Sequence, residues 1–138
     1  MSASGRQSWL ATAILIGVLY SLVGIVFGLP STHVRMWRLM AWLVSALVYA
    51  VHIAYEHFRL RNSPLATALH AALAVGVGAF GLAAAANIHE VWVAPSYRLL
   101  LALALVAWPV LTALPAFIVA LVAAYGLTLA RRRMAHAN

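Results

Sequence analysis

Residues 9–29 read WLATAILIGVLYSLVGIVFGL, an uninterrupted stretch without a charged side chain. A helix needs about 20 mostly apolar residues to cross the hydrocarbon core of a bilayer, and this stretch is long enough. Two further apolar runs, 36–58 and 64–87, follow after short polar links. Because no small-residue cleavage signal follows the first run before Pro30, we interpret it as a retained helix and not as a signal peptide. The first three runs therefore predict three membrane-spanning helices.

The fourth apolar run, 97–130, is longer than a membrane crossing requires. A straight helix of this length would extend about 50 Å, whereas the hydrocarbon core is about 30 Å thick. Pro109 and Pro115 each lack the N–H that would bond the carbonyl four residues before them. We therefore expect a long, proline-kinked fourth helix. The alternative is a re-entrant hairpin of two short limbs, which requires other parts of the protein to cover its turn.

The composition excludes an ordinary soluble domain. Of the 138 residues, 66% are apolar and 8% are charged, whereas soluble domains carry about 25% charged residues. The short links place helices that are consecutive in the sequence side by side in opposite directions. The predicted fold is all-α: one domain, residues 1–138, that forms an antiparallel bundle of four transmembrane helices. The chain has no cysteine, which excludes thiolate metal sites and thiol redox chemistry.

The basic charge lies at the ends of the predicted helices. The chain has a formal net charge of +7 from nine arginines and two glutamates. Arginines at helix ends meet lipid head groups, so this charge does not indicate nucleic-acid binding. One side carries Arg6, Arg59, Arg61, Arg131, Arg132 and Arg133, and the other carries Arg35, Arg38 and Arg98. The positive-inside rule thus predicts a multi-pass protein with both termini in the cytoplasm, and we expect a bacterial inner membrane.

Small residues are concentrated on the first and third predicted helices. They are Gly17, Ser21, Gly24 and Gly28 on the first, and Ala74, Gly78 and Gly81 on the third. Small side chains at such spacing let helix backbones approach closely. We interpret them as packing surfaces, either within the bundle or between copies of the chain. The alternative is a smooth face that accommodates a flat ligand.

Three polar residues lie within the apolar part of the second and third helices. His52 and Glu56 are four residues apart and share a face, while His70 lies about 10 Å deep on the third helix, at the depth of His52. Across an antiparallel hairpin the three side chains can meet. They could ligate a metal ion, His52 and His70 could supply two axial nitrogens to a haem, or the cluster could relay protons. A hydrogen-bonded pair that fixes helix register is the purely structural alternative, and His57 is interpreted as a head-group residue.

A second polar patch, Asn87, His89 and Glu90, follows the third run. We interpret it as a solvated loop over residues 87–96, with an outer vestibule or a partner contact as the alternative. Catalytic motifs such as HExxH are absent from the sequence.

The sequence favours a non-enzymatic membrane protein that acts as a subunit or self-associating scaffold. Its expected partners are membrane lipids and other membrane subunits or copies of itself. It could bind haem or a quinone-like ligand between the second and third helices. The first alternative is a transporter or channel component with an ion or proton path through His52, Glu56 and His70. The second is a membrane-embedded enzyme that acts on a lipid-like substrate, with the same cluster as acid and base.

Overall fold

A computed structural model describes the backbone of residues 3–93 and 98–137 and the side chains of residues 9–89 and 99–134. Within these ranges all regular secondary structure is helical. It forms α1 (Ala3–Gly28), α2 (Val34–Ala54), a π-helical turn η1 (Tyr55–Arg59), α3 (Pro64–Val93) and α4 (Arg98–Ala137). Each of the four α-helices contains a stretch that is long and apolar enough to span a membrane. The prediction of four such helices is confirmed.

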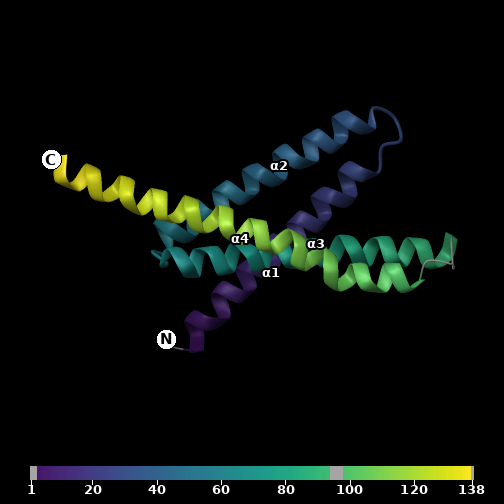
Figure 1. The fold of residues 1–138 in the computed structure, drawn as a ribbon, viewed down its shortest axis with the longest axis horizontal. Helices are drawn as coiled ribbons and strands as arrows, with labels where there is room; N and C mark the ends of the chain where they lie inside the picture. The colour runs from purple at the N-terminus through teal and green to yellow at the C-terminus, as the bar shows by residue number, and fades with distance from the viewer. Residues whose placement is uncertain (1–2, 94–97, 138) are drawn as a thin grey trace.

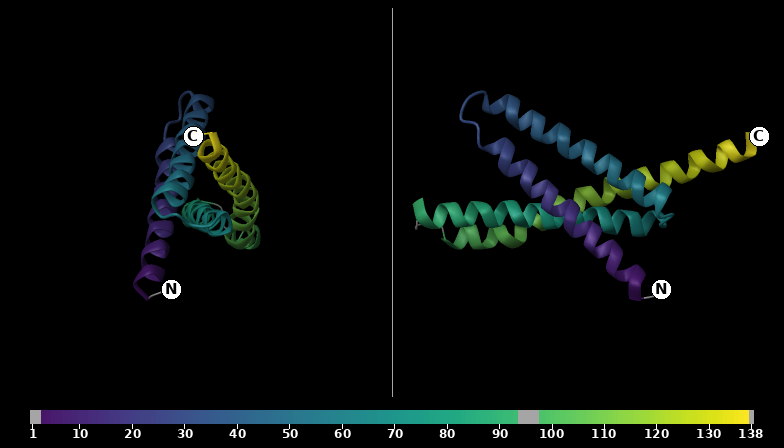
Figure 2. Two further views of the ribbon diagram at one scale, coloured as in Figure 1. Left: turned by 90° about the vertical axis from the view of Figure 1, so that its left-hand side faces the viewer. Right: turned by 180° about the vertical axis from the view of Figure 1, so that it is seen from behind.

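Helix α3 is the central element of the fold. It packs most extensively against α4 and next against α1, whereas α2 makes fewer contacts with α3 and α4. In Figure 1 the pair α1 and α2 crosses the pair α3 and α4, and the two views of Figure 2 show the same crossing. The start of α1, the link between α2 and α3, and the end of α4 lie toward one side of the molecule. The link between α1 and α2, the end of α3 and the start of α4 lie toward the opposite side.

Helices α1 and α3 approach closely through small residues. A Cβ atom added at Gly78 would lie 2.6 Å from the Cβ of Tyr20, and one added at Gly17 would lie 2.6 Å from the side chain of Val77. The Ser21 hydroxyl lies 3.1 Å from the Gly78 carbonyl, to which it donates across the interface. Added Cβ atoms at Gly24 and Gly81 would also meet the opposite helix, at Leu82 and Ser21, and Ala74 is fully buried in the same interface. A Cβ added at Gly28 would meet nothing within 4 Å, so this glycine does not take part in the close packing.

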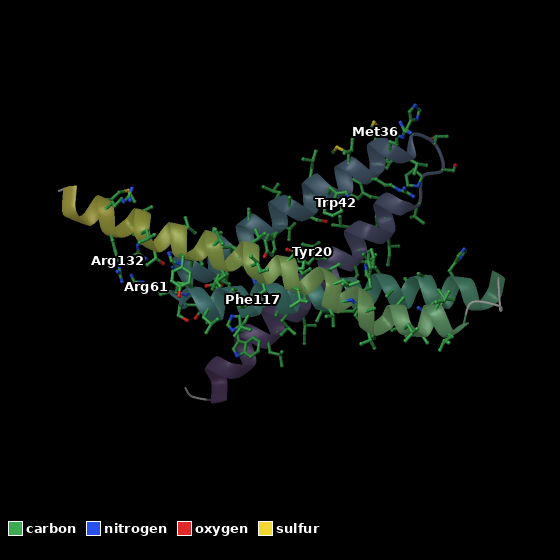
Figure 3. The ribbon with its side chains drawn as sticks, viewed as in Figure 1. Tyr20, Met36, Trp42, Arg61, Phe117 and Arg132 are labelled. Atoms are coloured by element: carbon green, nitrogen blue, oxygen red, sulfur yellow. The ribbon has the colours of Figure 1, made fainter. Side chains whose placement is uncertain are left out.

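A second core joins α2, α3 and α4. Ile53, Ala68, Ala71 and Ala120 are buried there, with Tyr49 and Phe117 packed against them. The Tyr49 hydroxyl donates a hydrogen bond to the carbonyl of Ala116, so that α2 is tied to α4 next to Pro115. Figure 3 places Tyr20 and Phe117 near the crossing of the two helix pairs. Outside this crossing, α2 presents large apolar side chains outward, among them Trp42, which is 77% exposed.

Helix α4 continues through both prolines. Pro109 and Pro115 lie inside one helix of 40 residues, and its ribbon is curved (Figure 2). The Thr112 hydroxyl lies 2.9 Å from the Trp108 carbonyl and 3.1 Å from the Pro109 carbonyl, and so supplies a donor in the turn between the prolines. The described chain therefore forms one long helix here and not two short limbs.

Several helix ends lie beyond their predicted positions. Helix α3 extends to Val93, so the prediction of a loop from Asn87 was wrong for residues 87–93. Polar residues alone do not end a helix, and the first residue that opposes continuation is Pro95, which also disfavours helix at the residue before it. Helix α1 begins earlier than the apolar run 9–29, and α4 ends later than the run 97–130, because their polar flanks continue the helix.

Candidate functional site

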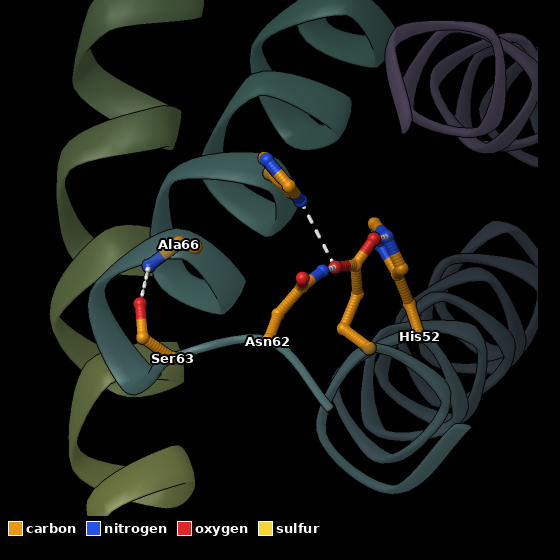
Figure 4. A network of polar contacts seen from close by, with 6 residues as sticks. His52, Asn62, Ser63 and Ala66 are labelled. Atoms are coloured by element: carbon orange, nitrogen blue, oxygen red, sulfur yellow. Dashed lines mark hydrogen bonds and ion pairs between the residues drawn. The ribbon is translucent and has the colours of Figure 1, made fainter. Parts of the chain in front are cut away.

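The candidate site lies where α2, η1 and α3 meet, and it contains the three residues that the sequence analysis selected. The Glu56 Oε2 atom lies 2.9 Å from His70 Nδ1, and the Glu56 Oε1 atom lies 3.6 Å from His52 Nε2. Glu56 is 0% exposed and His52 is 2% exposed. Figure 4 shows the carboxylate between the two imidazoles, which come from different helices. The structure thus brings His52, Glu56 and His70 together.

The π-helical turn η1 determines how the chain leaves α2. The Leu60 N–H donates to the Tyr55 carbonyl at 3.2 Å, a bond between residues five apart. Arg61 then adopts a left-handed conformation with φ of 52°, and the Asn62 N–H donates to the Glu56 carbonyl at 3.2 Å. Short π-helical segments are frequent at functional sites in proteins. Here the π-helical turn brings the backbone of the link between α2 and α3 back to Glu56.

Asn62 is a member of the cluster that the sequence analysis missed. Its side-chain amide donates a hydrogen bond to Glu56 Oε2 (Figure 4). The link then enters α3 through Ser63, whose hydroxyl accepts a bond from the Ala66 N–H at 3.3 Å. A side-chain acceptor at this position is a common helix N-cap. Asn62 stands directly before this capping serine, and this position is the only signal in the sequence that could have identified it.

Trp9 brings α1 to the same cluster. Its indole stacks on the His70 imidazole, with ring centroids 4.4 Å apart and ring planes inclined by 4°. In the sequence Trp9 has the position of an interfacial aromatic residue near a helix end. The contact shows that it also covers His70, which is 14% exposed in its side chain. Four segments of the chain therefore contribute a side chain to the cluster.

Among the described side chains, the partners of the Glu56 carboxylate are two titratable imidazoles and one neutral amide. Its ion-pair contacts are with His52 and His70, and its remaining hydrogen bond comes from Asn62. Burying a carboxylate without a compensating charge is costly, whereas a protonated histidine beside it supplies that charge. Within the described chain, both ring nitrogens of His52 and the Oε1 atom of Glu56 have no hydrogen-bond partner. The cluster can therefore gain or lose a proton without breaking an existing bond at His52.

The geometry does not favour the metal or haem interpretations of these residues. Among the residues whose placement is described, no three histidine, cysteine, aspartate or glutamate side chains form a group that could hold a metal ion. The reason is visible in the distances, because both imidazoles are directed at the carboxylate and not at a shared point beside it. The same carboxylate occupies the space between His52 and His70 that a haem plane would need.

His57 is more buried than its position at the end of a membrane helix suggests. It was interpreted as a head-group residue, yet it is only 5% exposed. The π-helical turn changes the register after Ala54, so that Glu56 and His57 are both buried although they are adjacent in the sequence. Glu56 contacts α3 through His70, whereas His57 lines a pocket with residues of α4. The burial of His57 was therefore not predicted from the sequence, whereas its interpretation as a head-group residue stays a prediction.

Asn87, of the second polar patch, joins two helices. The Asn87 side-chain amide donates to the carbonyls of Ala83 and Leu101, each at 2.9 Å, and so ties α3 to α4. It lies at a pocket of about 320 Å³ with otherwise apolar walls that include Trp108. His89 is exposed, and the side chain of Glu90 lies outside the described residues. Asn87 thus acts as a helix-to-helix contact.

Comparisons of the chain with models of known protein families, with curated proteins and with solved structures find no match.

Proposed function

We propose that the chain is a transporter or channel component of a membrane, in which Glu56 with His52 and His70 forms a proton-binding site. The observation that carries this proposal is the fully buried Glu56 carboxylate, whose ion-pair contacts in the described chain are two histidines. Ionisable residues among apolar helices are costly and mark proton or ion paths in membrane proteins. A carboxylate between imidazoles can exchange protons, since an imidazole can accept a proton on one ring nitrogen and donate one from the other.

The distances suggest an order for the proton transfers. The His70 side chain is 14% exposed, whereas the side chains of His52 and Glu56 are 0% exposed. His70 is therefore the member of the cluster that exchanges a proton with the surroundings. The proton passes from His70 Nδ1 to Glu56 Oε2 over 2.9 Å. Rotation of the protonated carboxyl group then turns this O–H toward His52 Nε2, which lies 3.6 Å from Glu56 Oε1, and the proton passes to that nitrogen. Each step moves one proton and leaves the sum of charges unchanged.

The proposal includes an orientation in the membrane. The four helices cross the bilayer as an antiparallel bundle, with both termini on the cytoplasmic side. This orientation is supported by Arg61 and Arg132, which lie toward the side of the start of α1 and the end of α4 (Figure 3), and by the neighbouring Arg59, Arg131 and Arg133 in the sequence. The link between α2 and α3 lies on that same side. The cluster is then near the cytoplasmic end of its helices.

Proton flux in liposomes tests the proposal. Liposomes that contain the purified chain and an internal pH-sensitive dye receive a potassium diffusion potential through valinomycin. We expect faster acidification than in protein-free liposomes, and we expect Glu56→Gln to remove this difference while the side chain keeps its shape. The control is His89→Gln, an exposed histidine outside the cluster. A flux equal to that of protein-free liposomes, or an unchanged flux for Glu56→Gln, would contradict the proposal.

A second candidate function is that of a subunit or self-associating scaffold. It is favoured by the outward apolar face of α2, where Trp42 is 77% exposed and Leu43 is 65% exposed. Such a face contacts lipid or another membrane helix. A ligand such as a quinone between α2 and α3 is not part of this candidate, because Glu56 fills the space between His52 and His70. Cysteine crosslinking at position 42 in membranes distinguishes a self-associated state from a monomer.

A further inference from the structure

A second polar site lies between η1 and the end of α4, apart from the Glu56 cluster. It is a pocket of about 290 Å³ lined by His57, Thr128, Arg131 and Arg132. His57 is 5% exposed, and neither of its ring nitrogens has a hydrogen-bond partner among the described residues. Its ring contacts Phe58 edge to face at 5.0 Å, a contact that leaves both nitrogens unused. A buried polar ring without a partner is unfavourable unless a ligand or solvent satisfies it.

The charges around this pocket all have one sign. Arg131 and Arg132 make no ion pair within the described chain, and α4 contains no acidic residue. The sequence has only two acids, and the side chain of one of them, Glu56, is bonded to His70 and Asn62. Two guanidinium groups and an imidazole N–H around one pocket match an oxyanion with several acceptor oxygens.

The position of the pocket along α4 indicates where the anion comes from. Arg131 directly follows the apolar run that ends at Ala130, and this is the depth at which lipid phosphates lie if the run crosses a bilayer. Thr128, one turn earlier, donates its hydroxyl proton to the Ala124 carbonyl at 2.8 Å, so the donors left for an anion are those of His57, Arg131 and Arg132. Basic pockets between membrane helices on the cytoplasmic side bind anionic lipid head groups.

We infer that His57, Arg131 and Arg132 form a specific site for a phosphate oxyanion, supplied by the head group of an anionic phospholipid. This inference does not depend on proton binding at Glu56. The guanidinium groups of Arg131 and Arg132 donate hydrogen bonds to the phosphate oxygens. The His57 N–H donates another hydrogen bond to the same phosphate from the buried wall of the pocket. The site differs from general attraction of a basic tail to a charged surface, because His57 comes from a different segment and is buried.

Native mass spectrometry of the detergent-purified chain tests the site with added phosphatidylglycerol and, separately, phosphatidylcholine. We expect retained phosphatidylglycerol to exceed phosphatidylcholine, and Arg131→Gln and Arg132→Gln each to weaken it about fivefold, the effect of about 1 kcal/mol per arginine. His57→Phe should also weaken it. Arg133→Gln is the matched control, because Arg133 has the same charge in the same cluster but does not line the pocket.

The outcomes distinguish a specific lipid-binding site from general attraction between charges. Equal losses for Arg133→Gln and Arg131→Gln, together with no effect of His57→Phe, would mean general charge attraction and overturn the inference. A third arm adds inorganic phosphate to the chain loaded with phosphatidylglycerol. Displacement of the lipid by millimolar phosphate would assign the site to a soluble anion and overturn its assignment to lipid. Retention of the lipid under that condition supports the head-group site.

Discussion

The Trp9 indole lies flat on the His70 imidazole, with ring planes inclined by 4° and centroids 4.4 Å apart. Trp9 belongs to α1 and His70 to α3, so the contact joins a third helix to a cluster that α2 and α3 otherwise form. Stacking fixes the plane of the imidazole and thereby directs Nδ1 at Glu56, 2.9 Å away. The position of the first helix and the geometry of the Glu56 cluster are therefore coupled.

Replacement of Trp9 by leucine should expose His70 and loosen the cluster. An aromatic pair contributes about 0.5–1.5 kcal/mol beyond its area, so we expect a lower thermal stability in detergent. We also expect faster modification of His70 by diethyl pyrocarbonate, measured by peptide mass spectrometry. Trp42→Leu is the control, since Trp42 is 77% exposed. Equal modification rates of His70 in both variants would show that the stack does not protect it.

The close packing of α1 against α3 gives a prediction for which the chain also offers a control glycine. Gly78→Ala places a Cβ 2.6 Å from the Tyr20 Cβ and 3.1 Å from the Gly17 carbonyl, and neither atom is the end of a flexible side chain. Overpacking of this kind costs about 1–3 kcal/mol. Gly126→Ala meets nothing within 4 Å and should be neutral or slightly stabilising because alanine favours helix. Thermal unfolding of the two variants in detergent measures the difference, and similar melting temperatures would contradict the close approach of α1 and α3.

The helices could be predicted from the sequence because apolar length is a strong signal that depends on no other part of the chain. The runs at 9–29, 36–58, 64–87 and 97–130 each lie mostly within one helix of the structure. Their ends could not be predicted in the same way. Helix α3 continues through polar residues such as Asn87 and His89, because a polar side chain does not remove the backbone hydrogen bonds of a helix. The next strong helix breaker in the sequence is Pro95.

Part of the candidate site also followed from helical geometry. Equal depth and the spacing of four residues selected His52, Glu56 and His70, which the structure brings together. Asn62 and Trp9 could not be selected, since their contacts depend on the path of a link and on the crossing of α1 over α3. The burial of His57 depends on the π-helical turn, whose register no periodicity of the sequence indicates.

The proposed orientation gives a prediction that is independent of the cluster. Alkaline phosphatase fused after Asn138 should be inactive, because the arginines 131–133 hold this end of α4 in the cytoplasm. The same enzyme inserted in the link between α1 and α2, after Ser31, should be active in the periplasm of a bacterial host. Expression of both fusions is compared by immunoblot. An active fusion after Asn138 would reverse the orientation and place Glu56 near the outer face.

The last prediction concerns the dependence of the two histidines on each other. His52 and His70 do not need to touch, since each contacts a different oxygen of Glu56. Removal of one imidazole leaves the buried carboxylate with one partner fewer to balance its charge. Removal of the second imidazole should therefore lower the unfolding free energy more than the same substitution does in the original chain. Residues in one network depart from additivity by about 0.5–3 kcal/mol. A double-mutant cycle with His52→Ala and His70→Ala, measured as unfolding free energy in detergent, determines this coupling.

The cycle requires a control that separates coupling through Glu56 from general loss of stability. His52→Ala combined with Asn87→Ala provides it, because Asn87 bonds Ala83 and Leu101 away from the cluster, and such distant pairs add within about 0.3–0.5 kcal/mol. The cycle repeated in a Glu56→Gln background should lose its coupling, since the neutral amide no longer needs a compensating charge. Additivity of His52→Ala and His70→Ala in the original chain would mean that each histidine is stabilised separately. In that case Glu56 would be a structural link between α2 and α3, and its contact with the two imidazoles would not be the basis of a proton-binding site.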